Sequence, residues 1–85
     1  MNWKQENNKL IKIFSFNNQE KLAEFFLDIA KISDQIHHHA DARIFQCSKL
    51  ELTLFTHDEN QITSKDFQLA KEIDECFKMF EISKM

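Results

Sequence analysis

Three consecutive histidines and a fourth one further along the chain are the side chains best suited to chemistry. His37, His38 and His39 form the run, and His57 comes directly after an alternating apolar segment. Histidine changes charge near neutral pH, so it suits proton transfer. A helix that runs into His38 and a strand that runs into His57 would bring these imidazoles into one pocket.

A carboxylate lies one helical turn before the histidine run. Asp34 precedes His38 by four residues, so the two side chains are neighbours if both are helical. A carboxylate beside an imidazole favours its charged form and fixes the orientation of the ring. An exposed ion pair of little energetic value is the alternative. Consecutive helical residues point about 100° apart, so the three histidines cannot all face one point.

Other candidate ligands and pocket residues leave two interpretations open. Three adjacent histidines do not match the spacings of structural zinc sites, and Cys47 and Cys76 add no ligand pair. We therefore expect no metal site, and both cysteines fit apolar patterns as core fillers. Trp3 is either a core aromatic, the more common fate of a lone Trp, or the wall of a pocket for a flat heterocycle.

Length and charge exclude several classes of protein. With 85 residues and a net charge of −3, the chain is predicted to be one domain, residues 1–85, without the basic patch of a nucleic-acid-binding protein. It has no apolar run that could span a bilayer, and no signal-peptide pattern follows Met1. Two cysteines without a paired spacing indicate reduced thiols in the cytoplasm.

The small core predicts an oligomer, a homodimer or homotetramer. More phenylalanine lies on the two predicted helices than one buried face needs: Phe25, Phe26, Phe67, Phe77 and Phe80.

Apolar periodicity predicts an α+β fold with a single antiparallel four-stranded sheet and two long helices packed on one face. The expected strands are a possible one near Trp3, then residues 9–16, a short strand within residues 40–49, and residues 50–57. The first expected helix runs from Gln19 to about Ile36 and is capped by Asn17 or Asn18. The second follows a capping box at residues 63–66 and reaches about Glu81. In the last strand, alternation places His57 on the face opposite the leucines. Because the chain has neither Gly nor Pro, we expect its turns to use Asn, Asp, Ser or other residues in right-handed or bridge conformations.

These segments, in this order, resemble the pterin-4a-carbinolamine dehydratase family. The family pattern has an acidic residue ahead of His-His-Pro, then a strand that ends Ser/Thr-His, then Leu-Thr-x-x-Asp-Phe-x-Leu-Ala-x-x-Ile. The matching segments here are Asp34, then His38-His39-Ala40, then Thr56-His57, and finally residues 62–73, which read ITSKDFQLAKEI. The resemblance covers almost the whole chain.

The chain departs from the family at four places. Ala40 replaces the proline, Cys47 replaces a tyrosine, and Asn60-Gln61 replaces a loop that usually carries glycine. The extra His37 leaves two registers open for the histidine pair, and we prefer His38-His39 because it keeps the family's spacing to the preceding acid. These departures bear on activity more than on fold.

The resemblance implies a hydro-lyase that dehydrates 4a-hydroxytetrahydrobiopterin to quinonoid dihydropterin in tetrahydrobiopterin recycling. It assigns proton transfer to His38 and His57, the orientation and charging of His38 to Asp34, and substrate contacts to His39 and Trp3. It implies a pterin as partner and neither a metal nor an organic cofactor. The alternative is a non-catalytic interaction or assembly module of the same fold that binds a protein partner.

Overall fold

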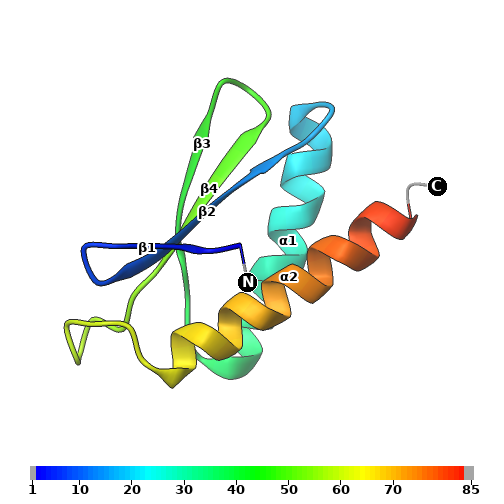
Figure 1. Ribbon diagram of the computed structural model, residues 1–85. Helices are drawn as coiled ribbons and strands as arrows, with labels where there is room; N and C mark the ends of the chain where they lie inside the picture. The colour runs from blue at the N-terminus through cyan, green and yellow to red at the C-terminus, as the bar shows by residue number, and fades with distance from the viewer. Residues whose placement is uncertain (1, 84–85) are drawn as a thin grey trace.

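The computed structural model describes residues 2–83 and has two layers, a sheet and a pair of helices that cover one of its faces (Figure 1). In chain order the elements are β1 (Lys4–Glu6), β2 (Lys9–Ser15), α1 (Gln19–Ile36), β3 (Asp41–Phe45), β4 (Lys49–Leu54) and α2 (Ser64–Ser83). All strand pairs are antiparallel, in the order β1-β2-β4-β3. The predicted α+β fold is confirmed. Within the described residues, neither helix is long and apolar enough to cross a membrane.

Strand β4 lies inside the sheet and carries the clearest alternation. Leu50, Leu52 and Leu54 are fully buried toward the helices, whereas Glu51 and Thr53 lie on the opposite face. Side chains along a strand alternate between faces, so the leucines form the centre of the core and the other face stays open.

Both helices begin at the residues that the sequence predicts. Asn18 is the N-cap of α1, and its Oδ1 accepts a hydrogen bond from the Lys21 N–H at 2.8 Å. Thr63 precedes α2, and its N–H donates to Asp66 Oδ2 at 2.9 Å. This second contact is the capping box predicted for residues 63–66, with Asp in the place of Glu.

The core lies between the sheet and the helices. Its buried apolar side chains are Trp3, Leu10, Phe14, Phe16, Leu22, Phe25, Ile29, Leu50, Leu52, Leu54, Leu69, Ala70 and Ile73. The predicted surplus of phenylalanine is smaller than expected, because Phe77 and Phe80 pack against this core. Phe26 and Phe67 remain exposed on the helices. The oligomer stays a prediction that now depends on fewer side chains.

The turns differ from the prediction. Asn7 and Asn8 join β1 to β2 in the left-handed region, and Gln46 and Cys47 do the same between β3 and β4. Residues 7–8 form a two-residue loop between the paired Glu6 and Lys9, and a type I′ loop of this length needs positive φ at both positions. Residues 46–48 form a three-residue loop between the paired Phe45 and Lys49. Both hairpins therefore use non-glycine residues at positive φ. Cys47 is therefore exposed at a turn, and its predicted place in the core is wrong; Cys76 is half-buried against the core.

Candidate functional site

The largest concentration of histidine lines a cavity of about 340 Å³ at the end of the sheet. The C-terminus of α1, the end of β4 and the start of α2 meet there (Figure 1). The lining residues are His37, His38, His39, Ala40, Asp41, Phe55, Thr56, His57, Asp58 and Lys65. The cavity brings His38 and His57 together, and His37 and His39 also belong to its lining.

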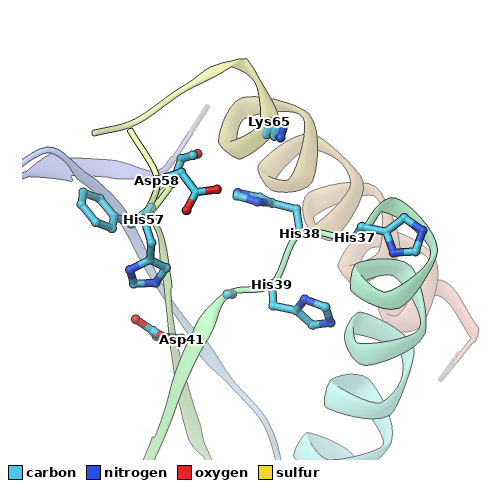
Figure 2. Close-up of a pocket in the computed structure, with 10 residues that line it drawn as sticks. His37, His38, His39, Asp41, His57, Asp58 and Lys65 are labelled. Carbon is cyan, nitrogen blue, oxygen red and sulfur yellow. The ribbon is translucent and has the colours of Figure 1, made fainter. Parts of the chain in front are cut away.

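His37 ends the first helix and turns the chain toward the cavity. Its φ of 56° and ψ of 39° are left-handed, and the N–H of His38 donates to the Ser33 carbonyl at 3.1 Å. This geometry closes a helix. Figure 2 shows the His37 ring directed away from the cavity and the His38 ring directed into it. This arrangement agrees with the preferred register, in which His38 rather than His37 is the first residue of the pair.

A buried carboxylate holds His38. Its Nε2 lies 2.6 Å from Oδ1 of Asp66, a residue with no exposed surface. The other oxygen of Asp66 accepts from the Thr56 hydroxyl at 2.7 Å and from the Thr63 N–H at 2.9 Å. When Asp66 is ionised, its carboxylate only accepts hydrogen bonds, and His38 then donates through Nε2. In that tautomer Nδ1 is the ring nitrogen that carries the lone pair.

The Thr56 hydroxyl links the carboxylate to a second hydroxyl. The oxygens of Thr56 and Thr63 lie 2.7 Å apart. Since the Thr56 proton goes to Asp66, the Thr63 hydroxyl donates to Thr56. Every polar group of this network therefore has a partner, which fixes the position of the carboxylate.

The predicted contact between Asp34 and His38 is wrong. Asp34 Oδ1 instead bonds His39 Nε2 at 2.7 Å. The physical reason is the left-handed residue His37, which ends α1 before His38 and removes the four-residue helical spacing. With side-chain exposures of 61% for His39 and 76% for Asp34, this pair contributes little to stability.

His57 approaches the cavity from the side opposite His38 (Figure 2). It is exposed, and its ring meets the edge of the Phe55 ring with centroids 5.2 Å apart. The loop that follows is closed by pairing of Thr56 with Gln61, and Asn60 in this loop has a φ of 55°. Asn tolerates the left-handed region that glycine otherwise supplies. The lack of glycine therefore does not prevent this loop from closing.

Trp3 does not line the cavity. It is 7% exposed in the core, contacts the Phe14 ring edge-on, and donates through Nε1 to the Asp74 carboxylate at 3.0 Å. Lys12 bonds the same carboxylate at 2.8 Å. Of the two interpretations of Trp3, the structure supports the core aromatic, and the predicted pocket wall is wrong for this chain.

The cavity also holds three charged side chains, Asp41, Asp58 and Lys65. In Figure 2, Asp58 lies between His57 and His38, and Asp41 lies beside His57. Among residues 2–83, no group of three His, Cys, Asp or Glu side chains is arranged to hold a metal ion. Two imidazoles at one cavity, one of them held by a buried carboxylate, are suited to acid–base chemistry.

Sequence reasoning missed Asp66 as part of the site. The sequence places Asp66 at the end of a capping box and within the family pattern of residues 62–73, and neither assigns it a contact with a histidine. The available signal was its second oxygen, since a carboxylate on the buried face of an amphipathic helix needs further partners. No pattern in the chain indicates that His38, which is 28 residues away, is that partner.

Comparisons with known proteins identify a family whose model matches most of the chain. Residues 1–76 match the model of a family described as pterin 4 alpha carbinolamine dehydratase. A protein of Sulfolobus acidocaldarius is 43% identical over 72 residues, which cover 85% of this chain and 78% of that protein. One of Metallosphaera sedula is 33% identical over 78 residues, covering 92% and 80%. Each is named "Putative pterin-4-alpha-carbinolamine dehydratase".

Two solved structures share the fold. A transcriptional coactivator/pterin dehydratase from Brucella melitensis superimposes with a TM-score of 0.81 at 21% identity, over 87% of this chain and 80% of the other. A pterin dehydratase-like RuBisCO assembly factor of the alpha-carboxysome gives 0.71 at 18% identity, over 87% of each chain. At these identities the likeness concerns the fold alone.

Proposed function

The chain belongs to the pterin 4 alpha carbinolamine dehydratase family, and we propose that it is an active hydro-lyase of that family. The substrate is a 4a-hydroxytetrahydropterin, with 4a-hydroxytetrahydrobiopterin as the reference compound. The products are quinonoid dihydropterin and water, as in the recycling of tetrahydrobiopterin. The expected compartment is the cytoplasm, where two thiols without a paired spacing stay reduced.

The reaction requires one proton to leave and one to arrive. The N5 proton is removed, a double bond forms between N5 and C4a, and the 4a-hydroxyl takes up a proton and departs as water. His38 donates a hydrogen bond from Nε2–H to Asp66, and its Nδ1 lone pair accepts the N5 proton. His57, which is exposed and exchanges protons with solvent, protonates the hydroxyl. His39, held by Asp34, contacts the pterin at the rim of the cavity.

The contact between His38 and Asp66 is the observation that carries this proposal. A histidine with no function can remain in solvent without a buried carboxylate as its partner. An aspartate that only caps a helix needs the backbone N–H at the cap and no imidazole. The 2.6 Å contact joins the two and orients a ring toward a cavity that contains a second histidine. Such a base, held in one tautomer by an acidic partner, is the arrangement that general acid–base catalysis uses.

A coupled assay on freshly generated 4a-hydroxytetrahydrobiopterin tests the proposal. His38→Ala and His57→Ala are each expected to slow the enzymatic step by about 10²- to 10⁴-fold. His37→Ala is the matched control, because its ring points away from the cavity (Figure 2), and it is expected to keep wild-type activity. If all three variants turn over substrate at the wild-type rate, the proposed roles are wrong.

Exposed apolar side chains favour the second candidate, a non-catalytic assembly module that binds a protein partner. Phe26 and Leu27 on α1 and Met79 and Ile82 on α2 are 37% to 64% exposed. Such a module would leave dehydration at its spontaneous rate in the wild type and in every histidine variant. The same assay therefore separates the two candidates.

A further inference from the structure

A second cavity adjoins the proposed active site and shares two residues with it. This cavity, of about 450 Å³, is lined by Asn7, Asn8, Lys9, Phe55, His57 and Asn60. Phe55 and His57 also line the histidine cavity. A pterin ring placed against His57 would therefore have the second cavity directly beside it.

The lining of the second cavity is cationic and rich in amides. Of the side chains in residues 2–83, Lys9 is the only permanently charged one in this lining, which includes no Asp or Glu. Asn7 and Asn8 lie in the β1–β2 turn and Asn60 lies in the loop after β4, so two separate turns contribute side chains to this cavity. All three have positive φ, at 53°, 61° and 55°. Amides donate and accept hydrogen bonds, and an ammonium only donates. The site thus suits a polar tail that ends in an anion.

The Lys9 ammonium is available to such a group. It lies 5.4 Å from the centroid of the Phe55 ring, on the sheet face away from the core. Its partner across the β1–β2 pair is Glu6, and that carboxylate bonds Lys4 at 2.8 Å. Within residues 2–83, Lys9 forms no ion pair, whereas Lys4 and Lys12 each bond a carboxylate.

We infer that this second cavity is a subsite for the C6 tail of the pterin and that it selects tails ending in a phosphate or carboxylate. The inference rests on the proposed function, because it requires the ring to occupy the histidine cavity. It goes further by naming the class of substrate: a reduced pterin with an anionic tail, which the Lys9 ammonium and the asparagine amides bind.

Calorimetric titration with matched ligands tests the inference. Dihydroneopterin and its monophosphate differ only in the phosphate, and dihydrofolate supplies a carboxylate tail. The wild type is expected to bind the monophosphate roughly three- to tenfold more tightly than dihydroneopterin, the range for one partly exposed charge-assisted contact. This ratio should fall as salt is added, because exposed charges are screened. Tight binding of dihydrofolate alone would identify the carboxylate as the preferred anion.

Two variants locate the effect. Lys9→Gln is expected to bring the ratio close to one, whereas Lys31→Gln, an exposed lysine on α1 that lines neither cavity, should keep the wild-type ratio. Asn8→Gly retains the left-handed turn and should weaken all tailed ligands, with a folded spectrum. Equal binding of charged and uncharged tails to the wild type would overturn the subsite and leave the pterin site standing. Failure of every pterin to bind would overturn both.

Discussion

Replacing Asp66 by Asn should reverse the tautomer of His38 while the protein stays folded. The carboxylate accepts three hydrogen bonds, from His38, Thr56 and Thr63. An amide has one oxygen, which can keep the two donors of Thr56 and Thr63. Its NH₂ group then faces His38 Nε2 and donates to it. The imidazole must accept there and carry its proton on Nδ1, the nitrogen that we propose removes the N5 proton.

The expected cost in stability follows from these three contacts. Changing a charge-assisted hydrogen bond to a neutral one loses about 1 kcal/mol, so Asp66→Asn should lower the free energy of unfolding by about 1 to 3 kcal/mol. A domain is stable by about 5 to 15 kcal/mol, and this variant stays folded. Asp66→Ala would leave three groups without partners, at about 1 to 3 kcal/mol each, and much of the protein would unfold.

Nitrogen NMR of the imidazole and the dehydration assay are the two readouts. In the wild type the His38 proton is expected on Nε2, and in Asp66→Asn on Nδ1. Activity should fall by about 10²- to 10⁴-fold, the span of one general acid–base group. A useful control is Asp34→Asn, since Asp34 bonds His39 and should leave the His38 tautomer unchanged. If Asp66→Asn keeps both the Nε2 tautomer and full activity, Asp66 is a helix cap and the reasoning is refuted.

Three further expectations concern other parts of the molecule. Asp34→Asn should shift the NMR signals of His39 and change thermal stability by less than about 1 kcal/mol, since the pair is exposed; a large loss of stability would contradict the geometry. Burial, with a smaller effect of Asp28, raises the pKa of the Cys76 thiol, so less thiolate is present at neutral pH. The exposed Cys47 should therefore react first with a thiol reagent, and preferential labelling of Cys76, read by mass spectrometry, would count against this. The protein should scatter light as a dimer or tetramer at micromolar concentration, because apolar side chains remain exposed on both helices; a monomer mass would remove that expectation.

Local patterns predicted most of the fold because each element carries its own signal. The first helix has an Asn cap and a continuous apolar face, so its bounds at Gln19–Ile36 agree with the expected ones. The alternation of leucines in β4 predicted which face is buried. The hairpin at Gln46 and Cys47 carried no such signal, since neither residue type is common at positive φ, and its position is set by the pairing of β3 with β4.

Sequence reasoning named the histidines that line the cavity but did not identify Asp66, the carboxylate that holds His38. The four-residue spacing predicted that Asp34 contacts His38, because it assumed that the helix continues two residues beyond Ile36. The left-handed residue His37 ends α1 before His38, and the His38 ring contacts Asp66 on α2 instead. Contacts between distant segments depend on tertiary packing, which no spacing of residues within one helix reports.

The most direct measurement of the central claim is the rate at which 4a-hydroxytetrahydrobiopterin loses water in the presence of this protein. Stopped-flow generation of the substrate, followed by its absorbance, gives the spontaneous rate and the catalysed rate in one experiment. We predict an acceleration that is proportional to protein concentration and that the double variant of His38→Ala with His57→Ala abolishes. A wild-type rate equal to the spontaneous rate at every protein concentration would contradict the assignment of dehydratase activity to this chain.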